Sequence, residues 1–178
     1  METYGEREDE MEQINKVQFS ELVETHQLSM FRLAKSLLNN EDDAEDAVSS
    51  AILKAYDGRN TIRDVKNFKS WILKIVSNEA YSIFRKKKKI VYMDNMSEVV
   101  EETQHTNEPE INYDVWDAVQ MLDEKFRAIV VLHYYDDLSI KVISEILDLN
   151  QNTVKVRLYR ARQQLKSDLM EQEGLNNE

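Results

Sequence analysis

Residues that interrupt helices are almost absent from this chain, and this scarcity constrains its fold more than any other feature. Only three glycines and one proline occur in 178 residues, whereas the turns between strands depend on such residues. No long stretch alternates apolar with polar side chains, as half-buried strands do. Hydrophobic residues instead recur with helical spacing in two blocks, roughly 16–90 and 111–171. The sequence therefore predicts an all-α protein with two small helical domains.

The segment between the two hydrophobic blocks has a different composition. Residues 90–110 contain six acidic and no basic side chains, together with Pro109. Such a segment cannot bury enough apolar surface to fold, so we predict a flexible acidic linker. The expected organisation is an acidic tail at 1–15, domains at 16–90 and 111–171, the linker at 91–110 and a short tail at 172–178.

Several classes of protein are disfavoured by what the sequence lacks. The absence of cysteine removes disulfides and cysteine–zinc sites and fits a reducing compartment. The three histidines lack metal-ligand spacing, and no nucleophile motif or glycine-rich loop accompanies the carboxylates. The aliphatic runs are too short to cross a bilayer, and the acidic start is unlike a secretory signal. We expect a cytoplasmic protein that is not an enzyme, with no metal, cofactor, small-molecule substrate or membrane insertion.

Positive charge is concentrated near the end of an otherwise acidic chain. The protein carries 34 acidic and 23 basic residues, yet residues 152–166 hold five basic side chains and no acidic one. This segment belongs to a helix–turn–helix pattern over 138–165. Ser139 and Asn150 precede the two helices and are suited to cap their N-termini.

The second of these helices has two distinct faces. An apolar stripe marks the face that we expect to be buried: Val154, Leu158, Ala161, Leu165 and Leu169. At about 100° per residue, the other face carries Val156, Tyr159 and Gln163, flanked by Lys155, Arg160 and Lys166, with Arg157 and Arg162 at its edges. Basic, aromatic and amide side chains on an exposed helix suit a DNA major groove. The alternative is that the basic residues only solvate the helix and complement its dipole.

A second candidate nucleic-acid surface lies on a predicted helix at 67–89. Its apolar face includes Trp71, which we expect to be a core residue. Another face gathers a basic, an amide, an aromatic and a second basic side chain: Lys74, Asn78, Tyr81 and Arg85. Basic tracks with aromatic platforms bind single strands. The run "RKKKK" that follows is weaker evidence, because such runs are also typical of solvated helix ends.

Together these segments resemble the extracytoplasmic-function group of bacterial sigma factors. "LSIKVISEILDLNQNTVKVRLYRARQQL" (138–165) is similar to region 4 of that family, which binds the −35 promoter element. "DAEDAVSSAILKAY" (43–56) is similar to its polymerase-docking helix, and "NFKSWILKIVSNEAYSIFRKKKK" (67–89) to the helix that opens the −10 element. One departure is Asp148, because the family usually has glycine there. The resemblance implies a region 2 helical bundle and a region 4 helix-turn-helix domain.

The resemblance also implies roles for individual residues. At the −35 element, Lys155, Val156, Tyr159 and Arg160 would lie closest to the bases, Arg157 and Arg162 would contact phosphate or pack, and Gln163 and Lys166 would complete the surface. The candidates at the −10 element are Arg59, Asn60, Arg63, Lys74, Asn78, Tyr81, Arg85 and Lys86. The candidates for polymerase docking are Glu45, Asp46 and Ser49.

The implied partners are core RNA polymerase, through its β′ coiled coil and β flap, promoter DNA, and an anti-sigma factor, which is often membrane-anchored. The chain is thus predicted to be an alternative sigma factor that directs promoter-specific initiation and aids promoter opening. A stand-alone helix-turn-helix regulator and a helical scaffold are the competing interpretations. We further hypothesise that the acidic tail and linker weaken DNA binding by the free protein, because phosphate contacts dominate such affinity.

Overall fold

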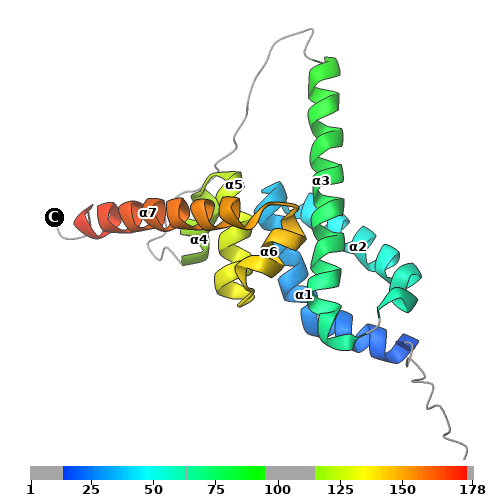
Figure 1. Cartoon of the computed structure of the whole chain (residues 1–178). Coiled ribbons are helices and arrows are strands. Elements are labelled where there is room, and N and C mark those ends of the chain that lie inside the picture. The colour runs from blue at the N-terminus through cyan, green and yellow to red at the C-terminus, as the bar shows by residue number, and fades with distance from the viewer. Residues whose placement is uncertain (1–13, 63, 95–114, 176–178) are drawn as a thin grey trace, which may run out of the picture.

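The computed structural model describes residues 14–62, 64–94 and 115–175. Within these ranges the chain forms helices joined by turns, which confirms the predicted all-α class (Figure 1). Arg63 and most of the predicted tails and linker lie outside the described residues. The elements are α1 (Lys16–Leu38), α2 (Glu41–Gly58), the short 3₁₀ turns η1 (Arg59–Thr61) and η2 (Val65–Asn67), α3 (Phe68–Asp94), α4 (Val115–Met121), α5 (Glu124–Val130), the π-helical turn η3 (Val131–Tyr135), α6 (Ile140–Leu147) and α7 (Gln151–Leu175).

The first domain is a bundle of α1, α2 and α3, in which each helix contacts the other two. Large side chains such as Leu33 of α1 and Ile72 of α3 are fully buried in it. Asn40 accepts a hydrogen bond from the backbone N–H of Asp43 and caps α2, as expected for asparagine directly before a helix. The side chains that α2 turns toward its neighbours are small, which lets the three helices approach closely: Ala44, Ala47, Ala51 and Ala55.

The second domain contains the predicted helix-turn-helix, formed by α6 and α7. Both predicted N-caps are confirmed: the Ser139 hydroxyl accepts a hydrogen bond from the N–H of Val142, and Asn150 accepts one from the N–H of Thr153. Between the helices, Asp148 adopts the left-handed conformation with φ 53°. Aspartate tolerates this region better than most residues, so the turn forms with aspartate at this position.

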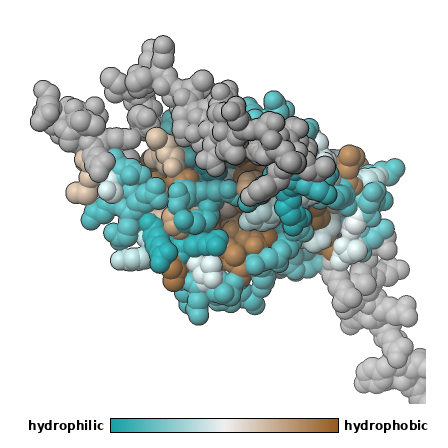
Figure 2. Space-filling model, turned by 90° about the horizontal axis from the view of Figure 1, so that it is seen from above, coloured by the Kyte–Doolittle hydropathy of each residue, from teal (hydrophilic) through white to brown (hydrophobic). Residues whose placement is uncertain are grey.

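The two domains pack directly against each other, an arrangement that the sequence pattern did not predict. Helix α1 contacts α5 and η3, and α3 contacts α6. Buried apolar residues from both domains form one continuous core. Arg127 crosses the boundary, since its Nε donates to the Ser36 carbonyl at 3.0 Å and its Nη1 to the Gln120 carbonyl at 3.1 Å. Figure 2 shows that hydrophilic side chains surround the apolar ones that remain visible on one face.

Two long helices extend beyond this packed core (Figure 1). Helix α3 continues to Asp94, past the domain boundary predicted at residue 90, and α7 continues to Leu175, past the boundary predicted at 171. The basic run at 85–89 lies on the extended part of α3, and all five of its side chains are exposed. Lys87 Nζ forms an ion pair with Asp43 Oδ2 of α2 at 2.5 Å, so the run still contacts the first domain while its exposed side chains carry positive charge into solvent.

Replacing Ile72 by alanine tests the packing of α3. Ile72 has no exposed surface, so Ile72→Ala should lower the free energy of unfolding by about 2–5 kcal/mol through lost burial and a residual cavity. Leu53→Ala is the matched control, because Leu53 is 70% exposed and its loss should change stability by less than about 0.5 kcal/mol. Urea unfolding followed by circular dichroism measures both. Equal losses for the two variants would contradict the buried placement of Ile72.

Candidate nucleic-acid interface

Burial of one side of α7 determines which of its side chains face solvent. Val154, Leu158 and Ala161 are buried with exposed fractions of 4% or less. The predicted base-proximal residues occupy the opposite side, and all four are exposed: Lys155, Val156, Tyr159 and Arg160. Gln163 and Lys166 are exposed as well. The helix therefore presents a cationic and aromatic face of the kind that enters a major groove.

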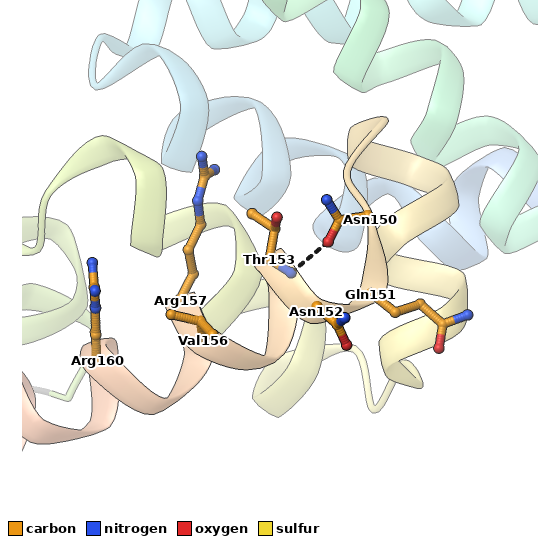
Figure 3. A pocket seen from close by; sticks show the side chains of 7 residues that line it. All are labelled: Asn150, Gln151, Asn152, Thr153, Val156, Arg157 and Arg160. Carbon is orange, nitrogen blue, oxygen red and sulfur yellow. Dashed lines mark hydrogen bonds between the residues drawn. The ribbon is translucent and has the colours of Figure 1, made fainter.

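A shallow groove of about 710 Å³ lies at the start of α7 (Figure 3). Its lining combines polar and basic side chains: Asn150, Gln151, Asn152, Thr153, Val156, Arg157 and Arg160. Asn150 is engaged in the cap, whereas Gln151 and Asn152 are exposed and lie in the first turn of the helix. These two amides are not among the predicted site residues. Their position could have indicated them, because the N-terminal residues of a helix that enters the major groove contact base edges.

The two arginines predicted at the edges of this face differ in their surroundings. The guanidinium of Arg162 lies 5.6 Å from the centre of the Tyr134 ring, and its Nε donates to the Tyr134 hydroxyl. Arg162 is thus held by η3. Arg157 is partly buried and lines both the groove of Figure 3 and a second groove between the domains.

Some of the side chains predicted to bind nucleic acid on α3 face solvent, and others lie against the second domain. Asn78, Arg85 and Lys86 are exposed. Lys74 is partly buried and forms an ion pair with Asp148 at 2.5 Å. Tyr81 lies in the interdomain groove with Arg157. Burial raises the pKa of Tyr81, nearby Glu124 adds to this effect and Arg157 opposes it, so its hydroxyl remains a neutral donor and acceptor at physiological pH.

The loop before α3 contributes two further predicted residues. The guanidinium of Arg59 lies 4.2 Å from the centre of the Tyr56 ring, and its Nη1 donates to the Tyr56 carbonyl at 2.8 Å. Asn60 is exposed beside it. Trp71 packs at the edge of the core against Phe68, as expected for a structural residue. The third predicted loop residue, Arg63, is outside the described residues.

The predicted docking residues share the solvent face of α2. Glu45, Asp46 and Ser49 are exposed, while Ala44, Ala47 and Ala51 on the other side are buried. Leu53 follows Ser49 by one helical turn and is also exposed. This exposed apolar side chain is not among the residues that the sequence predicted for docking.

The described residues offer neither a metal site nor a membrane-spanning helix. No group of three or more histidine, aspartate or glutamate side chains in this part of the chain is arranged to hold a metal ion. Among the described helices, none combines the length and the apolar character needed to cross a membrane.

Comparison with known protein families assigns both domains. Residues 22–90 match the family model of sigma-70 region 2, and residues 113–165 match that of sigma-70 region 4. The two matched segments correspond to the α1–α3 bundle and to the domain that contains α6 and α7. They also include the helices on which the two candidate nucleic-acid surfaces lie.

Similar proteins cover almost the whole chain. RNA polymerase sigma factor SigV of Bacillus subtilis is 36% identical over 149 residues, which are 83% of this chain and 89% of SigV. The ECF sigma factor SigW of the same organism is 27% identical over 165 residues, 85% of this chain and 88% of SigW. The sigma factor RpoE of Bartonella quintana, solved with the anti-sigma factor NepR, is 26% identical with a TM-score of 0.69, covering 85% of this chain and 96% of RpoE. The chain belongs to the extracytoplasmic-function group of the sigma-70 family of RNA polymerase sigma factors.

Proposed function

We propose that this sigma factor directs core RNA polymerase to promoters by binding the −35 element with α7 and the opened −10 element with α3 and the loop before it. The acid-free outer face of α7 is the observation that carries this proposal. Tyr159 is 62% exposed and Val156 49% exposed, with Lys155 and Arg160 beside them. Lysine and arginine neutralise phosphates and bind guanine edges, and the apolar side chains contact thymine methyls.

The proposed −10 surface has the composition of a single-strand site. Asn78 offers an amide for a base edge, Tyr81 an aromatic ring, and Arg85 and Lys86 neutralise the backbone. Arg59 and Asn60 extend this surface from the preceding loop, together with Arg63. The exposed run at 85–89 would make binding strongly salt-dependent, because each neutralised phosphate releases counterions.

The acidic face of α2 is the proposed docking surface for the polymerase. Glu45, Asp46 and Ser49 would contact the β′ coiled coil, and the second domain would contact the β flap. Binding, rather than chemistry, is the proposed role, so the chain needs no cofactor and acts in the cytoplasm with its polymerase. RpoE of Bartonella quintana was solved with an anti-sigma factor, and we propose a partner of the same kind here, with a membrane anchor as one of its forms.

The stand-alone regulator is the weaker interpretation. It would leave the region 2 match at 22–90 without a role, and it would have to bind promoter DNA without polymerase. A sigma factor accounts for both domains in one chain.

Replacing Arg160 by alanine tests the proposed −35 surface. Arg160→Ala should weaken binding of the reconstituted polymerase to a promoter fragment by about 10- to 100-fold, since a base contact is worth about 1–3 kcal/mol. The control is Lys125→Ala, which removes an exposed positive charge from the same domain but not from α7. Fluorescence anisotropy at fixed salt gives both affinities. If the two variants lost affinity equally, the face of α7 would not be the specific contact.

Reversing a charge on α2 tests the docking surface. Asp46→Lys should weaken binding to core polymerase by about tenfold or more, because like charges across an interface oppose association. Asp117→Lys on α4 makes the same charge change at another exposed aspartate and should have little effect. Binding of labelled sigma factor to core polymerase provides the measurement. Unchanged affinity for Asp46→Lys, with a normal circular dichroism spectrum, would refute this docking surface.

A further inference from the structure

Tyr134 is an exposed aromatic residue that lies beside α7 but belongs to neither candidate nucleic-acid surface. It is 53% exposed and is part of the π-helical turn η3 (Val131–Tyr135). Single π-helical turns are rare and frequently occur at functional sites. The ring of His133 packs edge-on against the ring of Tyr134, with 4.8 Å between their centres. Tyr134 is therefore open to solvent and yet held in a defined orientation.

The hydroxyl of Tyr134 orients the side chain of Arg162 on α7. Arg162 is exposed, its Nε donates a hydrogen bond to this hydroxyl, and its guanidinium lies 5.6 Å from the centre of the ring. Among the described residues, no carboxylate forms an ion pair with Arg162 and no hydrogen bond engages its two Nη groups. The N–H donors of both Nη groups are thus fixed in direction and available to a ligand.

A phenol orients an arginine without cancelling its positive charge. Two lysines of this chain, Lys69 and Lys74, are instead paired with carboxylates. A carboxylate at position 134 would hold Arg162 more strongly, but it would neutralise the guanidinium and repel an anion. The hydroxyl of Tyr134 carries no charge, so the pair keeps the full positive charge of Arg162. This arrangement favours an anionic ligand.

The Tyr134 hydroxyl also has a proton of its own to donate. A hydroxyl offers one donor and two acceptor positions, and here one acceptor position is filled by Arg162 Nε. Accepting a hydrogen bond from a cation polarises the O–H bond and makes it a better donor. The hydroxyl and the neighbouring Nη groups together provide donors of the kind that bind phosphate oxygens.

The pair lies on a row of basic side chains along one edge of α7. At about 100° per residue, Lys155, Arg162 and Lys166 fall within about 40° of one another, and all three are exposed. A basic row at the edge of a helix that enters the major groove is placed to follow the sugar–phosphate backbone. Tyr134 adds an uncharged donor to this row from outside the helix.

We propose that Tyr134 and Arg162 form one phosphate site at the edge of the −35 interface, in which the Tyr134 hydroxyl and the Arg162 Nη groups bind the same backbone phosphate of promoter DNA. Tyr134 both positions the guanidinium and donates to the phosphate. Phosphate contacts fix the register of a protein on the duplex without reading its sequence, so the pair sets how α7 lies in the groove. The inference rests on the proposed binding of the −35 element by α7.

Removal of the hydroxyl alone tests the pair. Tyr134→Phe keeps the ring and should weaken binding of the reconstituted polymerase to a promoter fragment about 3- to 10-fold, the range for one hydrogen bond. Arg162→Ala should weaken binding at least as much. The double variant should weaken it by less than the product of the two factors, because the residues share one contact. Lys125→Ala, at an exposed position outside α7, is the control and should have little effect.

The salt dependence of binding separates the two roles. Arg162→Ala should lower the slope of log affinity against log salt by about one, since it removes a charged phosphate contact. Tyr134→Phe removes no charge and should leave the slope nearly unchanged. Fluorescence anisotropy over a range of salt concentrations gives both slopes, and circular dichroism shows whether each variant keeps its helical content.

Neutral methylphosphonate in place of one phosphate at a time across the −35 block locates the contact. Wild-type polymerase should lose affinity when the phosphate bound by the pair is replaced. Tyr134→Phe and Arg162→Ala should both be less sensitive at that position and as sensitive as wild type elsewhere. A purely structural role for Tyr134 would lower affinity by the same factor for every fragment.

Tyr134→Phe that binds as tightly as wild type, or that keeps the wild-type sensitivity to every methylphosphonate, would overturn the shared phosphate site. Failure of the proposed function has a different signature, which is a wild-type polymerase that binds equally well with and without the −35 block. That result would refute promoter recognition by α7 and the phosphate site with it.

Discussion

The rotation of α7 about its own axis determines which of its side chains are buried and which face solvent. Burial of Val154, Leu158 and Ala161 fixes that rotation, because turning the helix would expose these side chains and lose their hydrophobic stabilisation. The cationic and aromatic side chains consequently project from the opposite side. The same logic applies to α3, where buried Ile72, Val76 and Ala80 leave Asn78 and Arg85 exposed. In both helices, burial of the apolar side chains therefore determines which polar side chains face solvent.

The two domains are held together by apolar contacts and by ion pairs. Apolar side chains from both domains share one core, and ion pairs at Lys69 and Lys74 cross the boundary. The apolar contacts supply stabilisation that does not depend on direction, whereas the ion pairs specify which surfaces meet.

Local features of this fold were predictable from the sequence, and long-range features were not. The caps at Asn40, Ser139 and Asn150 follow from residue type and position within a few residues, so the pattern was sufficient. The pairing of Lys74 with Asp148, the contact of Arg162 with Tyr134 and the π-helical turn η3 depend on tertiary packing. Hydrophobic periodicity contains no information about such partners. The departure from glycine at position 148 was visible in the sequence, but its ion pair became apparent only in the structure.

The most direct test of the central claim is in vitro transcription by core polymerase from a pool of randomised promoters, with and without the full-length chain. A sigma factor with two DNA-binding surfaces held by polymerase should enrich two sequence blocks at a fixed separation, and only when both proteins are present. Enrichment of a single block, or of the same block by the chain alone, would contradict the account. Transcripts that begin without any sequence enrichment would contradict it as well.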